Sequence, residues 1–404
     1  MIRDDVFTVF KENGEEEEAF EYRWGETENS QYRLERATRR IGTLETPPEN
    51  KTLNYNDLDR VFLLVSERGS GFKVFRKWLE NGACREEASP GERGETETGP
   101  AKQSFQNMVS PPWMVIDGNL VLHQSDANPP RFWQGFLSGE PGNFILDRTF
   151  HGDSQTSPAA NLALAQINGV VEAMRHSPKF RFIHASYHLP SMEIDPVFSH
   201  LLDQCHLYRL PQFEIDELVT WLAQLAAKYK HRSIGIHLEA EEKEHLARQI
   251  KFRVGGQPRL TSALFRLVDD AILTQLPEEE RKPPKKAPPP PQSHTPLGFN
   301  TLRQLFHVMG QELERNPPHI VERWKEDLMG FLRKDNHVVQ LLRRYADDKP
   351  KPKTDSHYPA DTQLYLAGWA GLDPDGKWGI RSQCHKQWAG ELLRKFDQDK
   401  ERGR

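Results

Sequence analysis

Residues Arg60–Glu80 read RVFLLVSERGSGFKVFRKWLE, and the prediction of the fold starts from this stretch. The apolar run Arg60–Val65 is typical of a strand that is buried on both faces, and Lys73–Asn81 has the spacing of a helix. A short loop with two glycines joins them. A strand, a glycine-containing loop and a helix in this order form the frame of a phosphate-binding loop, because N–H groups of the loop and of the helix start converge on phosphate oxygens.

The loop departs from the GxxxxGK[ST] pattern of nucleotide-binding loops. Ser66 stands at the first glycine position, and Phe72 and Lys73 then stand at the lysine and hydroxyl positions. A shift by one residue makes Lys73 the phosphate lysine, but it places Val74 where a Ser or Thr would hold Mg²⁺. Neither register supplies that hydroxyl, so the loop is either a degenerate phosphate loop or an ordinary strand-to-helix turn. The other loop candidates for a vestigial nucleotide site are Gly69, Ser70 and Gly71.

Strand-like and helix-like segments alternate after this loop. Strand patterns occur at Pro112–His123, Asn143–Asp147 and Arg181–Ser186, and the alanine-rich segment Ala159–Arg175 predicts a helix. Strands separated by helices favour a parallel sheet with helices on both faces. We therefore expect an α/β core.

One aspartate, Asp147, ends a predicted strand of this core. A nucleotide-hydrolysing fold places its metal-orienting carboxylate there, usually followed by a Glu that activates water. Here Arg148 follows, so that general base is missing. Asp117 is a weaker candidate for the same role, and each aspartate is also a common residue in a turn at a strand end.

The pattern becomes helical from Glu214 onward. The turn in RVGGQPRL, residues Arg253–Leu260, separates two of the helices, and Arg259 stands where an arginine can approach a γ-phosphate. An exposed arginine at a helix start is the plainer interpretation of Arg259. The expected helices are Glu214–Lys228, Glu239–Phe252, Pro258–Gln275, Phe299–Glu314, Pro318–Arg333 and His337–Tyr345.

The C-terminal tail carries a hairpin signal. The turn sequence DPDG at Asp373–Gly376 lies between apolar runs, which is typical of a β-hairpin. A hairpin that follows three helices suggests a winged helix.

Two low-complexity segments divide the chain. Pro277–Pro296 reads PEEERKPPKKAPPPPQSHTP, a semi-extended linker, and Arg85–Lys102 has no large apolar residue, as in a mobile surface insert. The expected parts are an N-terminal extension at 1–55, an α/β core at 56–210 with the insert at 85–102, a helical lid at 211–276, a proline-rich linker at 277–297 and a winged-helix domain at 298–404.

Taken together, these segments resemble the AAA-like NTPases of the STAND class, AAA+ P-loop proteins of bacterial conflict and signalling systems. RFIHAS at Arg181–Ser186 is similar to the sensor strand, GGQP at Gly255–Pro258 to the turn of the lid, and LYLAGWAGLDPDGKWGIRSQCHKQW at Leu364–Trp388 to the winged-helix end. The core resemblance covers roughly Asp57–Leu276. It implies an AAA+-like parallel-sheet core with a helical lid, a switch-like architecture and a role in partner binding. Hydrolysis is not implied, because the departures fall on the chemical groups.

Composition excludes several other classes of protein. The 404 residues are 36% hydrophobic and 28% charged, with a formal net charge of −5 that gives no general reason to bind nucleic acid or an anionic membrane. No run of 18 apolar residues occurs, so we expect a cytoplasmic protein with no membrane partner. Cys84, Cys205 and Cys384 form no CxxC motif, and no residue is assigned a catalytic or metal-binding role.

We therefore expect a degenerate regulatory or adaptor protein that binds another protein of the same bacterial defence or signalling system. It would hydrolyse little or no NTP and hold either no cofactor or weakly bound ATP or ADP. One alternative is a working ATPase switch completed in a homo-oligomer. Another is a regulator that binds DNA through the winged helix, but Asp373 and Asp375 on the hairpin repel phosphate and the basic stretch Arg343–Lys353 is modest.

Overall fold

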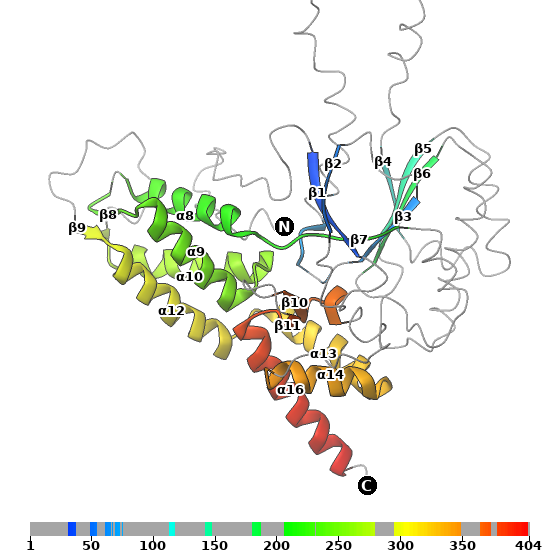
Figure 1. Ribbon diagram of the computed structural model, residues 1–404. Helices are drawn as coiled ribbons and strands as arrows, with labels where there is room; N and C mark the ends of the chain where they lie inside the picture. The colour runs from blue at the N-terminus through cyan, green and yellow to red at the C-terminus, as the bar shows by residue number, and fades with distance from the viewer. Residues whose placement is uncertain are drawn as a thin grey trace, which may run out of the picture.

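The computed structural model describes the strands of an N-terminal sheet and most of the helical C-terminal half (Figure 1). The described residues are 31–37, 49–54, 61–65, 67, 69–72, 75, 113–117, 142–147, 180–186, 206–230, 232–278, 295–348, 364–372 and 378–402. The predicted insert at 85–102, the predicted helix Ala159–Arg175 and most of the proline-rich linker lie outside them.

The described strands of the N-terminal half form one seven-stranded sheet in the order β2-β1-β7-β3-β6-β5-β4. Strands β4, β5, β6, β3 and β7 run parallel to their neighbours, which confirms the predicted parallel sheet, and β1 and β2 extend it in antiparallel pairing beside β7. The strands are β1 Gln31–Ala37, β2 Glu49–Asn54, β3 Val61–Val65, β4 Trp113–Asp117, β5 Gly142–Asp147, β6 Phe180–Ser186 and β7 His206–Arg209.

The loop after β3 lies at the point in the sheet where successive strands of the chain change from one side of β3 to the other. The chain leaves β3 for the far edge at β4, returns through β5 and β6 and then crosses to β7 on the other side of β3. In open α/β sheets, ligands bind beyond the carboxyl ends of the strands at such a switch point. The glycine loop therefore lies where this type of sheet commonly binds its ligand.

All six predicted helices of the C-terminal half are confirmed. They begin and end within two residues of the predicted bounds because apolar periodicity and end signals agree. Both α8 and α9, for example, begin with a glutamate capping box. They are α8 Ile215–Tyr229, α9 Ala240–Val254, α10 Pro258–Leu273, α12 Phe299–Arg315, α13 His319–Lys334 and α14 Asn336–Ala346.

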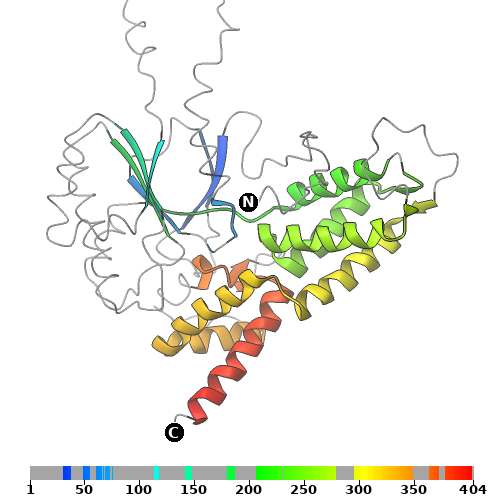
Figure 2. The same cartoon turned by 180° about the vertical axis from the view of Figure 1, so that it is seen from behind.

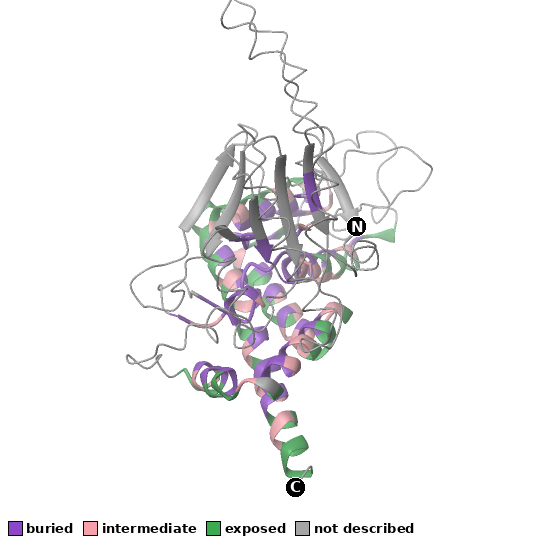
Figure 3. Cartoon of the chain, turned by 90° about the vertical axis from the view of Figure 1, so that its right-hand side faces the viewer, coloured by how far each residue is buried: buried purple, intermediate pink, exposed green. Residues whose placement is uncertain are grey.

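The sequence did not predict one further described helix, α16, or the strands β1, β2, β7, β8 and β9. Helix α16 covers Gln383–Arg402, and its second half extends into solvent beyond the other helices (Figure 3). Strands β8 (Ile234–Ile236) and β9 (Thr295–Leu297) pair in parallel, so the chain on both sides of the proline-rich segment belongs to one structure. No helix among the described residues is long and apolar enough to cross a membrane.

A row of aromatic side chains joins the helices before and after the proline-rich segment. The ring centroids of Trp221 in α8 and Phe265 in α10 lie 5.1 Å apart, and those of Phe265 and Phe306 in α12 also lie 5.1 Å apart. Both pairs of rings are arranged edge to face. Aromatic rings bury large apolar areas and favour this geometry. Helix α12 therefore packs directly on α10.

The predicted C-terminal hairpin is confirmed by the antiparallel pairing of β10 (Ala370–Leu372) with β11 (Trp378–Ile380). Tyr365 packs against Trp378 with ring centroids 5.7 Å apart. In both views the hairpin lies between the sheet and helices α13 and α14 (Figure 1, Figure 2). This position brings the C-terminal segment under the carboxyl ends of the parallel strands.

The turn between α9 and α10 requires glycine. Gly255 and Gly256 have φ angles of +70° and +65°, and the N–H of Phe213 donates a hydrogen bond to the Gly256 carbonyl at 2.8 Å. A Cβ on Gly256 would meet the backbone carbonyl of Phe213. The turn therefore fixes the segment that leads from β7 into α8 against the start of α10.

We predict that Gly256→Ala destabilises the protein by about 1–3 kcal/mol, because it combines a left-handed backbone with a clash against a neighbouring backbone. The matched control is Gly390→Ala in α16, where a Cβ would meet nothing within 4 Å. That change should be neutral or stabilise by up to about 1 kcal/mol, because alanine favours a helix interior. Urea unfolding of both variants measures the difference, and equal midpoints would contradict the role assigned to the turn.

Candidate functional site

The loop after β3 makes the predicted strand-to-helix transition. Gly69 and Gly71 adopt φ angles of +79° and +98°, and the N–H of Ser70 donates to the carbonyl of Glu67 at 3.2 Å. Phe75 then donates its N–H to the carbonyl of Gly71 at 3.1 Å, which forms a first helical turn. The predicted site residues Ser66 and Lys73 lie outside the described residues.

The dominant interaction of this loop is a buried carboxylate, Glu67. Arg209 donates from Nη2 to both carboxylate oxygens at 2.9 and 2.8 Å, and Arg381 donates from Nη1 to Oε1 at 3.2 Å. The side-chain amide of Gln212 donates to Oε1 at 2.7 Å. Glu67 is 4% exposed and Arg209 is 1% exposed, so this is a buried charge network.

Glu67 is ionised in the folded protein. Burial alone would raise the pKa of its carboxyl, but the charges of Arg209 and Arg381 and the hydrogen bond from Arg209 together lower it below its ordinary value. An ionised carboxylate only accepts hydrogen bonds, and charged donors give it the strongest ones. The network therefore stabilises the charged form.

Three segments far apart in the sequence meet at Glu67. Glu67 lies in the loop after β3, Arg209 ends β7, and Arg381 follows the hairpin strand β11. Arg381 also donates from Nη2 to the carbonyl of Ala370 at 3.1 Å. The carboxylate thus links the sheet to the C-terminal segment.

The C-terminal segment adds two further contacts. The guanidinium carbon of Arg209 lies 4.8 Å from the centroid of the Tyr365 ring, a cation–π arrangement. Gly368, with φ +85°, approaches so closely that a Cβ there would lie 2.9 Å from the Cδ atom of Glu67. Tyr365 therefore packs on Arg209, and Gly368 and Arg381 pack on Glu67.

Two helices cover the loop from the side of Gly69. A Cβ on Gly69 would lie 3.0 Å from the Cβ atom of Arg259 in α10 and 3.0 Å from the Cδ1 atom of Ile320 in α13. The structure thus brings together two predicted site residues, Gly69 and Arg259. Arg259 has its pKa lowered, first by burial and then by Arg266. Ser70, another predicted site residue, is 2% exposed.

The backbone of Asp147 lies at the same edge of the sheet. It ends β5 and pairs in register with Asp117 of β4 and Ala185 of β6, while Val65 at the end of β3 pairs with Ser186. The side chain of Asp147 lies outside the described part of the chain. Within that part, no group of three or more His, Cys, Asp or Glu side chains is placed to hold a metal ion.

The sequence did not predict the hydrogen-bond acceptor at the centre of this site, the carboxylate of Glu67. Glu67 forms its ion pairs with residues 142 and 314 positions away, and no local spacing connects them. Chemically, a carboxylate and a phosphate compete for the same guanidinium donors. Arg209 and Arg381 therefore already have an internal carboxylate as their partner.

A buried histidine lies beside this network. His385 stacks on Trp324 with centroids 6.0 Å apart, and its Nδ1 lies 2.7 Å from Oγ of Ser382. Burial, and after it the charge of Arg381, lower the pKa of His385 to about 3. The imidazole is therefore neutral in the folded protein at neutral pH.

The pKa of His385 predicts a pH dependence of stability. An unfolded histidine has a pKa of about 6.5, so as the pH falls from about 6.5 towards 3 the unfolded state binds a proton that the folded state does not. The free energy of unfolding should fall by about 1.4 kcal/mol per pH unit across that window. Urea unfolding between pH 7 and pH 5 should show this slope in the wild type and in the exposed control His319→Gln. The variant His385→Gln should lose it; an unchanged slope in that variant would contradict the assignment.

Sequence comparison identifies no relatives, whereas structural comparison gives weak likenesses. No protein-family model matches the chain, and no curated protein sequence matches it. A katanin structure, from a study of katanin self-assembly, has a TM-score of 0.32 at 9% identity and covers 64% of this chain and 73% of its own. The Aeropyrum pernix ORC1 protein in complex with DNA has a TM-score of 0.32 at 12% identity, covering 84% and 87%. A Thermotoga maritima RuvB mutant has a TM-score of 0.33 at 12% identity, covering 80% and 85%. Scores this low do not establish a shared family.

Proposed function

We propose that this protein is a regulatory or adaptor protein on an AAA+-like core, which binds a protein partner and hydrolyses little or no NTP. The observation that supports it most is the buried Glu67 carboxylate, which engages Arg209 and Arg381 at the glycine loop. The parallel sheet with this loop at its switch point supports the AAA+-like core.

The chemistry of NTP hydrolysis needs groups that this chain does not provide in their usual places. Phosphoryl transfer depends on Mg²⁺, charge-stabilising donors and a residue that orients the attacking water. Neither register of the loop offers the Mg²⁺ hydroxyl, and Arg148 follows Asp147 where a general base would stand. Arg259 and Ile320 lie close to Gly69, and Ser70 and Gly71 are buried.

The same contacts support a switch-like role for the C-terminal half. In this proposal the helices α12–α16 and the β10–β11 hairpin form a winged-helix domain that lies closed on the core. The Glu67–Arg381 ion pair favours that closed form, because separating the two would remove one of the two cationic partners of the buried carboxylate. A protein partner that favours the released domain would shift the equilibrium toward the open form.

The partner in this proposal is another protein of the same bacterial defence or signalling system, for which this chain is an accessory component. No nuclease or protease motif is present in the sequence, so the output of the system would belong to another chain.

We predict no Mg²⁺-dependent ATP hydrolysis above background, because the loop is buried at Ser70 and Gly71 and lacks the metal hydroxyl. A phosphate-release assay on the wild type and on Lys73→Ala measures this, and the two proteins should give the same background rate. Hydrolysis by the wild type that is lost in Lys73→Ala would refute the proposal. Hydrolysis that rises together with nucleotide-dependent assembly in light scattering would instead favour the ATPase completed by a neighbouring subunit.

A further inference from the structure

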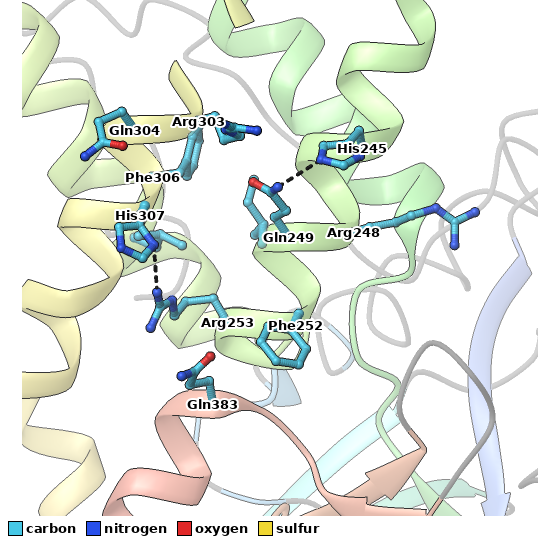
Figure 4. A pocket seen from close by; sticks show the side chains of 12 residues that line it. His245, Arg248, Gln249, Phe252, Arg253, Arg303, Gln304, Phe306, His307 and Gln383 are labelled. Carbon is cyan, nitrogen blue, oxygen red and sulfur yellow. Dashed lines mark hydrogen bonds between the residues drawn. The ribbon is translucent and has the colours of Figure 1, made fainter. Parts of the chain in front are cut away.

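A cavity of about 680 Å³ opens between α9 and α12, and none of the described residues of the glycine loop lines it (Figure 4). Helix α9 contributes one wall and α12 the other, with Leu264 of α10 and Gln383 at the start of α16 completing the lining. Cavities of several hundred cubic ångströms are typical of small-molecule sites.

The lining is rich in cationic and amide groups. It includes Arg248, Arg253 and Arg303 and two histidines, and no carboxylate is among the lining residues. Two of the lining arginines pair with carboxylates that are not among the lining residues: Arg253 with Glu314, and Arg248 with Glu244. Figure 4 shows that Arg248 extends away from the cavity. Arg253 and Arg303 are therefore the two lining arginines whose positive charge a ligand in the cavity would meet.

Arg253 is held in place by its neighbours. Its Nη1 pairs with Glu314, and its Nη2 lies 3.1 Å from Nδ1 of His307, towards which it points in Figure 4. Across from it, the guanidinium of Arg303 lies 5.7 Å from the ring centroid of Phe299. Both terminal nitrogens of Arg253 thus have partners inside the protein, whereas the exposed guanidinium of Arg303 can offer paired N–H donors to the oxygens of a phosphate.

An exposed aromatic ring lies in the same cavity. Phe252 is 57% exposed, the most exposed large apolar side chain among the described residues. The amides of Gln249, Gln304 and Gln383 also line the space. An aromatic face can stack on a nucleobase, and an amide offers both a donor and an acceptor to a base edge.

We propose that this cavity binds a nucleotide, either free or within a single strand of nucleic acid. Arg303 would hold the phosphate beside the positive charge of Arg253, Phe252 would stack on the base and the glutamine amides would contact the base edge. An acidic peptide would use the arginines alone and would leave Phe252 uncovered. This inference does not rest on the proposed function, since the cavity is separate from the glycine loop.

Binding is tested by fluorescence anisotropy with two probes at low salt, a fluorescent ATP analogue and a fluorescein-labelled oligoadenylate. We expect saturable binding of at least one probe. Arg303→Gln and Phe252→Ala should each weaken binding roughly tenfold, which is the order expected for a lost phosphate or stacking contact. The matched control is Arg323→Gln, an exposed arginine on α13 outside the cavity, which should bind as the wild type does.

Comparison of the two probes distinguishes a free nucleotide from a strand. Binding of the ATP analogue should persist in Lys73→Ala, which separates this cavity from the glycine loop and from the outcome of the hydrolysis assay. Absence of binding by both probes would overturn the proposal. Binding that is indifferent to Phe252→Ala, or that polyglutamate displaces as well as unlabelled nucleotide does, would also overturn it, because the site would then recognise charge alone.

Discussion

The ionised carboxylate of Glu67 constrains the rest of the structure. A buried charge without a partner costs several kcal/mol, so the folded chain must keep cationic donors beside it. One donor ends a strand of the sheet and another follows the C-terminal hairpin, 314 positions away. The burial of the glycine loop therefore depends in part on the C-terminal half, which supplies one of the two cations on Glu67. The close approaches of Gly368 to Glu67, and of Ile320 and Arg259 to Gly69, are parts of the same closed arrangement.

The closed arrangement and the α9–α12 cavity give the molecule two separate regions with different chemistry. At the glycine loop, arginines that could bind an anion already bind an internal carboxylate. In the cavity, arginine and aromatic side chains line an open space. Glu314, which pairs with Arg253, is not among the lining residues. Ligands of open α/β sheets commonly bind at the first region. Here the internal carboxylate makes that region a contact between the sheet and the C-terminal segment, and the proposed ligand site lies on helices on both sides of the proline-rich segment.

Much of the fold was predictable because its signals are local. Apolar runs such as Val61–Val65 and Gly142–Asp147 predict buried parallel strands, and helix periodicity with end signals predicts α8 to α14. Strand β7 was missed because HLYR is short and has no clear alternation, and α16 was missed because its polar second half packs against little. The centre of the candidate site was not predictable. Glu67 looks like an ordinary loop residue, and its role arises from pairings with Arg209 and Arg381 that only the folded topology creates.

The most direct test of the closed arrangement is a double-mutant cycle between Glu67 and Arg381, measured by urea unfolding. Removing one partner of a buried ion pair costs about 3–5 kcal/mol, so Glu67→Gln should be strongly destabilising, while Arg381→Gln should cost less because Arg209 still pairs with Glu67. The double variant should be less destabilised than the sum of the two single changes, with a coupling energy of about 0.5–3 kcal/mol. Additive effects, with no coupling between the two sites, would contradict the claim that this ion pair holds the C-terminal half on the loop.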